Sequence, residues 1–311
     1  LAPFYPIVSM VLDYRTVSKL DSTFIQGLDK EIASDGRIHT TFHQTLTTTG
    51  RLSSSDPNLQ NIPMRDDLGR QVRKAFIPTP GYVLIDADYS QVELRILAAL
   101  SEDENLLDAF HDKADIHKRT ATSIFGVRED QVTPAQRSAA KTVNFSIIYG
   151  ISDFGLAQDL KITRKEAKAY IESYYDHYSK VKPYMDSLIA FAYDHGYVET
   201  YFGRRRYIPE LQMKDFNVRK FGERAAMNAP IQGTAADIMK LAMIRAEKAI
   251  RDLNLDAGLL VQVHDELLME VREDQAKEAV ELLKDAMEGA VDLGVALPVD
   301  IKVASNWYQS K

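Results

Sequence analysis

Two aspartates stand out because each follows an apolar run typical of a buried strand. Asp88 ends the stretch 83–88, and Asp265 follows the stretch 259–263. A carboxylate at the edge of a packed strand is held rigidly and can still face a cleft. Two such carboxylates repel each other unless divalent cations lie between them, an arrangement that suits two-metal phosphoryl transfer. Each motif alone is also typical of a strand that ends in a solvated aspartate.

The segment between these aspartates contains a well-marked helix, which we predict over residues 133–150. Thr133 is a good N-cap, Pro134 suits the first turn, and Gln136 completes a capping box. Gly150 is a natural stop, because glycine accepts the left-handed backbone that ends many helices.

Four side chains of this helix form a stripe of graded chemistry. Arg137, Lys141, Phe145 and Tyr149 recur at intervals of four residues, so they share one face. At about 1.5 Å per residue the stripe is roughly 18 Å long. A guanidinium and an ammonium suit phosphates, and two aromatic rings suit a sugar and a base, so the order matches a nucleoside triphosphate. An amphipathic helix with a basic end and an aromatic core contact gives the same pattern.

These motifs, with two more blocks, closely resemble DNA polymerases of family A. The matching segments follow the order of the family and cover nearly the whole chain: residues 49–54, 57–63, 88–95, 137–150, 228–237 and 262–266. Val92 stands where the family usually has Ile. The resemblance implies an enzyme, a DNA-directed DNA polymerase that adds deoxynucleotides to a primer 3′-hydroxyl and releases pyrophosphate.

The resemblance also implies a site for two Mg²⁺ ions. Asp88, Asp265 and the carbonyl oxygen of Tyr89 would be the metal ligands, and Glu266 would assist nearby. Oxygen ligands, with water and substrate phosphates completing the coordination, are typical of magnesium. Asp86 shares a strand face with Asp88, but the family does not usually have an acid there, so we interpret it as a local feature.

The incoming nucleotide would be held by three basic side chains. By resemblance, Arg137 and Lys141 bind the triphosphate, and His117 adds a further phosphate contact. Lys141 is also expected to take part in catalysis, where it could protonate the leaving pyrophosphate.

Three further residues are expected to contact the nucleotide, and two of them select the sugar. Gln91 belongs to the first motif, beside Glu93. In the family, the residue at Glu93 is a steric gate that leaves no room for a 2′-hydroxyl. Phe145 occupies a position where family members have Phe or Tyr, and Phe is typical of enzymes that reject dideoxynucleotides.

Primer-template DNA is the other expected partner. The resemblance assigns its contacts, in the minor groove or on the sugar-phosphate backbone, to Arg51, Arg224, Asn228, Gln232 and His264. Minor-groove acceptors are nearly the same for every base pair, so such contacts test base-pair shape without reading the sequence.

Three other functions share part of this pattern. A single-subunit RNA polymerase has a related nucleotide helix, but Glu93 and Phe145 oppose a ribonucleotide substrate. A non-catalytic DNA-binding module would not need the full set of metal and triphosphate residues. A metal-dependent nuclease would use paired carboxylates without the graded helix.

Composition excludes several classes of protein. The chain has 311 residues, 45% of them hydrophobic, which is enough for a large core and two or three subdomains. It shows no apolar run of about 18 residues, and its amphipathic start leads us to expect no secretory leader. Cysteine is absent, so disulfides and thiolate metal sites are excluded. Together with the resemblance, this implies a monomer in the bacterial cytoplasm, associated with the nucleoid and not with a membrane.

The net charge of −7 argues mildly against nucleic-acid binding. Basic residues nevertheless gather locally, at 204–206 and at Lys214, Arg219, Lys220 and Arg224. A local basic surface can bind DNA on an acidic protein.

The predicted fold class is α+β, with an antiparallel palm sheet, flanking helices and a mostly helical fingers subdomain. We expect the end of the thumb at 1–30, the first part of the palm at 31–105, the fingers at 106–222 and the second part of the palm at 223–311. Family members carry most of the thumb, and usually two nuclease-type domains, before this region. We therefore expect a fragment of a larger polymerase, without proofreading or 5′ nuclease activity in this chain.

Overall fold

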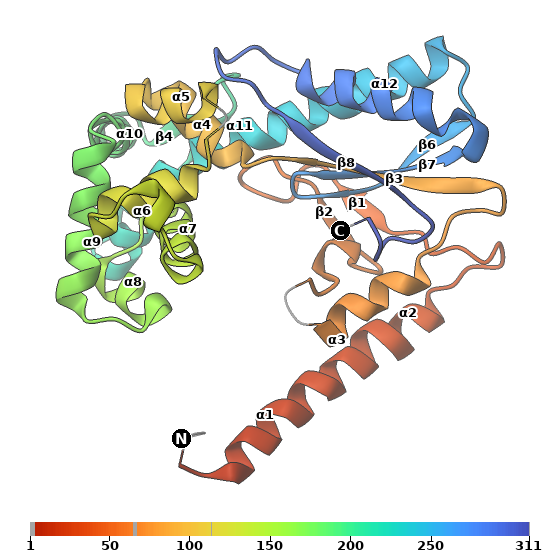
Figure 1. Ribbon diagram of the computed structural model, residues 1–311, viewed down its shortest axis with the longest axis horizontal. Coiled ribbons are helices and arrows are strands. Elements are labelled where there is room, and N and C mark those ends of the chain that lie inside the picture. The colour runs from red at the N-terminus through yellow and green to blue at the C-terminus, as the bar shows by residue number, and fades with distance from the viewer. Residues whose placement is uncertain (1–3, 65–66, 113, 311) are drawn as a thin grey trace.

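A four-stranded antiparallel sheet lies at the centre of the larger lobe of the molecule (Figure 1). The computed structural model describes residues 4–64, 67–112 and 114–310. The strand order is β6-β7-β3-β8, with β3 at Tyr82–Tyr89, β6 at Ala257–Val263, β7 at Glu266–Arg272 and β8 at Val299–Ala304. Helices flank the sheet, which confirms the predicted α+β class.

The register of this sheet brings the two predicted motifs together. Asp88 at the end of β3 pairs with Glu266 at the start of β7. The turn between β6 and β7 contains His264, in the left-handed region at φ 56°, and Asp265. The backbone N–H of Tyr89 donates to the Asp265 carbonyl at 3.0 Å, so the hairpin turn is fixed beside the end of β3.

Side chains alternate along β3, so one face of the strand packs into the main core and the other face carries both apolar and acidic side chains. Ile85 and Ala87 belong to the main core, which includes the buried face of α12 (Ala276–Glu288) and the long helix α11 (Phe216–Asp252). Leu84 points to the opposite face and joins a smaller core with Leu268 and Trp307. Because side chains alternate along a strand, Asp86 and Asp88 lie on this second face, away from α12.

A helical lobe lies beside the sheet (Figure 1). It contains α5 (Glu104–His111), α6 (Ile116–Phe125), α7 (Pro134–Ile148), α8 (Asp153–Leu160), α9 (Arg164–His177) and α10 (Val181–His195). The short hairpin β4–β5 follows, at Tyr197–Glu199 and Arg205–Tyr207. Two helices link the lobes: α4 (Val92–Ser101) continues directly from β3, and α11 runs from the helical lobe to the sheet. The expected boundary at residue 222 falls inside α11.

The N-terminal helices lie on the side of the sheet away from α12 (Figure 1). Helix α1 (Pro6–Lys19) has no buried residue and continues through a π-helical segment, Leu20–Ile25, into α2 (Gln26–Lys30). A small sheet of β1 (Thr41–His43) and β2 (Ser53–Ser55) and the short helix α3 (Asp67–Arg70) lead to β3. Within the described residues, none of the helices combines the length and the apolar character that crossing a bilayer requires.

Candidate active site

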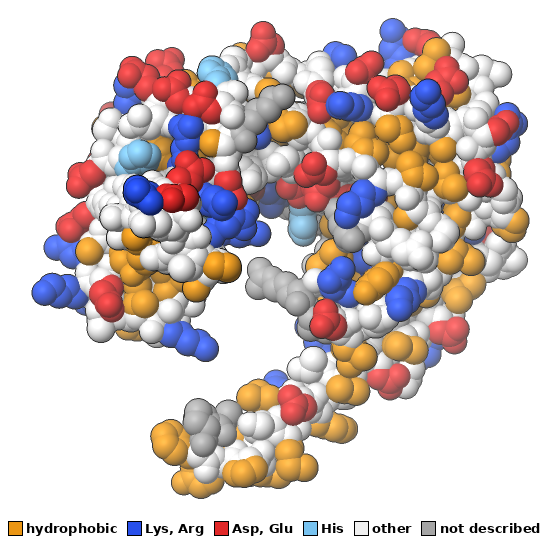
Figure 2. Space-filling model, in the orientation of Figure 1, with side chains coloured by type: hydrophobic (Ala, Val, Ile, Leu, Met, Phe, Trp, Pro, Cys, Tyr) orange, Lys and Arg blue, Asp and Glu red, His pale blue; other side chains and the backbone are white. Residues whose placement is uncertain are grey.

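The two lobes enclose a cavity of about 500 Å³. Figure 2 shows the hollow between the lobes, with Lys and Arg side chains on the wall of the helical lobe and acidic side chains deeper between the lobes. The lining residues are Arg51, Gln91, Val92, Glu93, His117, Arg137, Lys141, Phe145, Tyr149, His264 and Asp265. All of them except Val92 were predicted as site residues from the sequence, so the fold brings most of the predicted set into one space.

The remaining carboxylates lie at the edge of this space. Asp88 is half-buried, and its cross-strand neighbour Glu266 is 5% exposed. Both follow the sheet register, which also fixes Tyr89 through its backbone bond to Asp265. The structure therefore places Asp88, Tyr89, Asp265 and Glu266 side by side, as predicted.

Helix α7 carries the graded stripe along the cavity wall. Its capping box is present: the Gln136 N–H donates to Thr133 Oγ1 at 3.2 Å, and the Thr133 N–H donates to Gln136 Oε1 at 2.9 Å. The helix ends at Ile148, and Gly150 follows at φ 63°, the conformation expected of a glycine stop. The predicted helix and its N-cap are confirmed; its last residue is Ile148, so Tyr149 is the C-cap residue and lies just beyond the helix.

Arg137 is already paired with a carboxylate in this structure. Its Nε lies 2.6 Å from Asp115 Oδ2, and Asp115 caps α6 by accepting from the backbone N–H groups of His117 and Lys118. Burial alone would raise the pKa of Asp115, but the bonds from Arg137 and the two N–H groups outweigh it and lower that pKa. This role of Asp115 was not predicted; the available signal was its position as an Asp immediately before a helical segment.

His117 is a neutral side chain directed at the cavity. It is 3% exposed, and its Nδ1 lies 2.9 Å from the amide nitrogen of Asn144. Burial lowers the pKa of His117 to about 4, opposed by Asp115 and helped by the charges of Arg137 and Lys141. Because the amide donates to Nδ1, the ring proton belongs on Nε2, where it can donate to an anionic ligand.

Glu93 is held by both of its carboxylate oxygens. It is 7% exposed, Arg51 Nη2 lies 2.5 Å from Oε1, and the Tyr149 hydroxyl donates to Oε2 at 3.1 Å. Burial, followed by the Glu93 charge, raises the pKa of Tyr149, so the phenol stays protonated and remains a donor. The result is a rigid carboxylate on the cavity wall.

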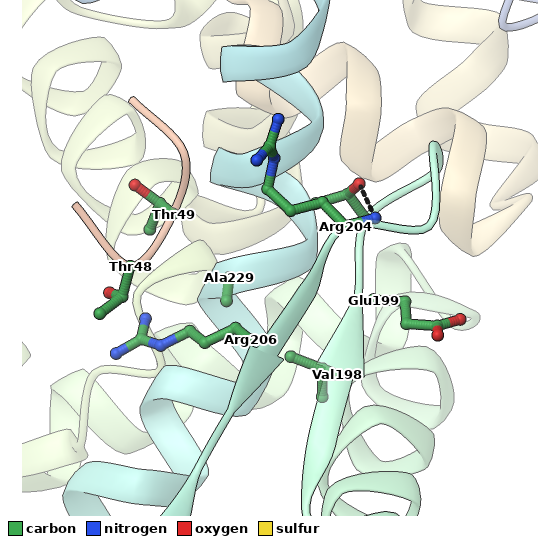
Figure 3. Close-up of a pocket in the computed structure, with 8 residues that line it drawn as sticks. Thr48, Thr49, Val198, Glu199, Arg204, Arg206 and Ala229 are labelled. Atoms are coloured by element: carbon green, nitrogen blue, oxygen red, sulfur yellow. Dashed lines mark hydrogen bonds between the residues drawn. The ribbon is translucent and has the colours of Figure 1, made fainter. Parts of the chain in front are cut away.

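The loop that carries Arg51 is packed tightly against α11. Figure 3 shows Thr48 and Thr49 of this loop facing the β4–β5 hairpin and α11. A Cβ at Gly233 of α11 would lie 2.5 Å from Thr200 Cγ2 and 3.2 Å from the Thr49 carbonyl oxygen. This close approach of backbone to helix fixes the loop, and the Thr47 hydroxyl adds a 2.6 Å bond to the Arg51 carbonyl.

The three predicted DNA contacts on α11 share one helix face. Arg224, Asn228 and Gln232 recur every four residues, and none of them lines the cavity. Arg224 is exposed and packs near Gly150 at the end of α7, while Gln232 lies within hydrogen-bonding reach of the Tyr149 phenol. Both ends of the row therefore lie near the C-terminal end of α7, and Gln232 lies beside Tyr149 at the cavity wall.

Asp265 carries the clearest electrostatic signature of the site. Burial, followed by the charge of Asp88, raises the pKa of Asp265 to about 7. Two ionised carboxylates so placed need a cation between them. In the described part of the chain, no group of three or more His, Asp or Glu side chains forms a complete metal cage. Two carboxylates and a carbonyl fit an ion that takes its other ligands from water and substrate phosphates, as Mg²⁺ does.

Comparison with known sequences decides the family. A profile of DNA polymerase family A matches residues 1–309. The chain belongs to DNA polymerase family A. Its family A relatives include DNA polymerase I of Caldicellulosiruptor bescii, 53% identical over 99% of this chain, and DNA polymerase I of Bacillus subtilis, 50% identical over 100% of it. The chain spans 36% of the length of each of these relatives.

A solved family A structure has the same fold. It is the POL domain of Pol1 from M. smegmatis, in complex with a DNA primer-template and dNTP. The two structures superpose with a TM-score of 0.94 at 46% sequence identity, over 98% of this chain and 54% of that one. The similarity therefore extends over both lobes and the cavity between them.

Proposed function

We propose that this chain catalyses template-directed DNA synthesis, as the polymerase region of a DNA polymerase I. In the proposed reaction the primer 3′-oxygen attacks the α-phosphorus of a deoxynucleoside triphosphate. A new phosphodiester bond forms, the bond to the β-phosphate breaks, and pyrophosphate leaves.

One observation carries this proposal. A single cavity joins Asp265 to the four side chains of the α7 stripe and to Glu93. A nuclease has no need of a graded triphosphate wall, and a binding module has no need of coupled carboxylates. Membership of family A supports the same activity.

The α7 wall would hold and orient the triphosphate. Arg137 would leave Asp115 for the outer phosphates, because a guanidinium binds two oxygens at once. Lys141 is exposed in the cavity and would place a compact charge nearer the reacting phosphorus, where it can also give a proton to the leaving pyrophosphate. His117, neutral, would donate one hydrogen bond from Nε2.

The opposite wall would select the sugar and the base pair. Glu93, held by Arg51 and Tyr149, would exclude a 2′-hydroxyl, with Gln91 beside it and Phe145 across the cavity. The newest base pairs of the duplex would be contacted by Arg51, Arg224, Asn228, Gln232 and His264.

Family A DNA polymerases use divalent metal ions, and the residues here fit two Mg²⁺. Asp88, Asp265 and the Tyr89 carbonyl would hold them, with Glu266 nearby. When bound, such ions activate the primer hydroxyl and stabilise the charge of the leaving group. The raised pKa of Asp265 is consistent with this assignment, because a bound cation favours the ionised carboxylate.

The proposal also covers the binding partners, the cellular location and the subdomains of the chain. The partners are primer-template DNA and deoxynucleoside triphosphates, bound by a monomer in the bacterial cytoplasm at the nucleoid. Residues 1–30 would belong to the thumb, 31–105 and 223–311 to the palm, and 106–222 to the fingers.

Primer extension tests this function directly. A primer annealed to templates that differ only in the next base is mixed with the protein, Mg²⁺ and each dNTP or rNTP in turn. We expect one product band per template, made only from the complementary dNTP. Extension that ignores the template base, or no extension at any protein concentration, would contradict the proposal.

A further inference from the structure

A buried arginine lies directly behind the carboxylates of the site. Arg73, in the 3-10 helix Gln71–Ala75, is 2% exposed. Its Nη1 lies 3.5 Å from Glu266 Oε1, and its guanidinium carbon lies 4.0 Å from the centre of the Trp307 ring. A cation buried this deeply is costly unless anionic and aromatic neighbours compensate it, and both are present here.

Trp307 binds the same carboxylate oxygen as Arg73. It is fully buried, and its indole N–H donates to Glu266 Oε1 at 2.8 Å. Its backbone N–H donates to the Phe76 carbonyl at 3.0 Å, and the Phe76 ring meets it edge-on at 5.4 Å. The segment that carries Arg73 therefore also fixes Trp307, so the two contacts to Glu266 form one assembly.

The C-terminal turn reaches the active-site strand at a second point. The Ser310 hydroxyl donates to Asp86 Oδ2 at 2.7 Å, and both residues are buried. Asp86 lies two residues before Asp88 on the same face of β3, and Glu266 is the cross-strand neighbour of Asp88. Three acids thus share a small area of the sheet, and Arg73 supplies a buried positive charge next to them.

Arg73 and Trp307 together determine which way the Glu266 carboxylate points. Because Asp88 and Asp265 are adjacent, repulsion favours a rotamer that turns the Glu266 carboxylate away from them. The charge of Arg73 reduces that repulsion, and the fixed indole N–H selects the position of Oε1. A buried ion pair contributes little net stability compared with apolar packing, so its presence here is better explained by orientation than by folding.

We propose that Arg73 and Trp307 are positioning residues that hold Glu266 in its working orientation beside Asp88, and that the C-terminal turn belongs to the framework of the site. This inference rests on the proposed function, since Glu266 needs a fixed orientation only if the carboxylates act together. It also gives Asp86 a role, as the anchor of Ser310.

Single-turnover extension tests the inference through two conservative variants. Trp307→Phe keeps an aromatic ring and removes the N–H; Arg73→Lys keeps the charge and changes the geometry. We expect the maximal rate to fall roughly 10–100-fold, as for other small misplacements of a reacting group, with unchanged affinities for dNTP and duplex. Ser305→Ala is the matched control and should keep the wild-type rate, because Ser305 is in the same turn but exposed, and among the described residues its hydroxyl bonds Gln309.

A double-mutant cycle separates positioning from general damage. In a Glu266→Gln background, Trp307→Phe should cause little further loss of rate, because the oriented carboxylate is already gone. Equal losses in both backgrounds, or no loss in either, would overturn the inference. If the wild type extends primers and the cycle fails, only this inference is lost; if the wild type shows no extension, the proposed function fails first.

Fluorescence gives a readout that needs neither metal nor turnover. Trp307 is the single tryptophan of the chain, so its emission reports the Glu266 contact directly. In metal-free protein, Glu266→Gln and Arg73→Lys should each shift the tryptophan emission, and Ser305→Ala should not. Unchanged emission in both variants would contradict the contact that the inference requires.

Discussion

At the scale of single residues, two carboxylates of this site, Glu93 and Asp115, are each held at two points or more. Glu93 is bound through both oxygens, and Asp115 accepts from a side chain and two backbone N–H groups. Such fixation removes rotamer freedom before any ligand arrives. The residue types were readable from the sequence, whereas their partners were not, because a motif gives no information about which distant side chain will meet it.

Variants of Glu93 can separate the effect of its side-chain size on sugar selection from the effect of its charge. Glu93→Ala should lower the preference for dNTP over rNTP roughly 10–100-fold, because it removes the side chain that we propose excludes a 2′-hydroxyl. Glu93→Gln keeps the size and should retain most of the preference. The ratio of kcat/KM values for a dNTP and its rNTP measures both. An unaltered ratio in the alanine variant would count against the steric gate.

Phe145 gives a test of sugar recognition at the 3′ position. The centre of its ring lies 6.1 Å from that of His117, which also lines the cavity. Phe145→Tyr adds a phenolic oxygen, which can bond where a dideoxynucleotide lacks its 3′-hydroxyl. We expect dideoxynucleotide incorporation relative to dNTP to rise roughly tenfold, about the effect of one good hydrogen bond. Chain-termination ladders would show it, and unchanged ladders would refute it.

The ionisation of Asp265 links the active site to the folding stability of the protein. Its pKa is about 7 in the folded, metal-free protein and near 3.8 when unfolded, so the folded state binds more protons between these values. Stability from this group is therefore present at low pH and lost as the pH rises towards about 7. Asp265→Asn removes the loss and should stabilise the metal-free protein by about 1–3 kcal/mol at about pH 8, with little effect at about pH 4. Urea unfolding with a chelator measures this; a destabilised variant at the higher pH would contradict it.

At the scale of elements, local signals predicted α7 well. Thr133, Pro134, Gln136 and Gly150 fix its ends through contacts within a few residues, which a sequence displays directly. The start of α9 has a second capping box, at Thr163 and Glu166, which is the same kind of local signal. Close packing between elements was not predictable, since it depends on which backbones meet.

A Gly233 variant tests one such contact, the close packing of α11 against Thr200 and the loop that carries Arg51. Alanine is normally the better helix former by about 1 kcal/mol, yet a methyl group here would meet Thr200 Cγ2 at 2.5 Å. Gly233→Ala should therefore destabilise the protein, by roughly 1–3 kcal/mol, and should weaken duplex binding by shifting the Arg51 loop.

Thr200→Ser is the matched control for this change. It deletes only Cγ2 and keeps the hydroxyl that bonds Asp237. Combined with Gly233→Ala, it should restore most of the lost free energy of unfolding. A Gly233→Ala variant more stable than the wild type would show that the loop does not pack as described.

At the scale of the whole molecule, the meeting of Asp88 and Asp265 was predicted, but mainly from the resemblance. Strand-end aspartates far apart in the sequence are compatible with many topologies, and only the β6-β7-β3-β8 order makes them neighbours. The buried assembly of Arg73, Glu266 and Trp307 joins segments from three parts of the chain. No local pattern marks it, so it could not be found before the fold was known.

The most direct test of the account is single-turnover addition of one complementary dNTP to a primer, with Mg²⁺, by the wild type, Asp88→Asn and Asp265→Asn. Asp274→Asn, an exposed carboxylate paired with Arg272, is the charge-matched control. We predict template-directed addition by the wild type and the control, and a loss of at least about 10³-fold in both site variants with dNTP affinity retained. Wild-type rates in Asp88→Asn or Asp265→Asn would contradict it.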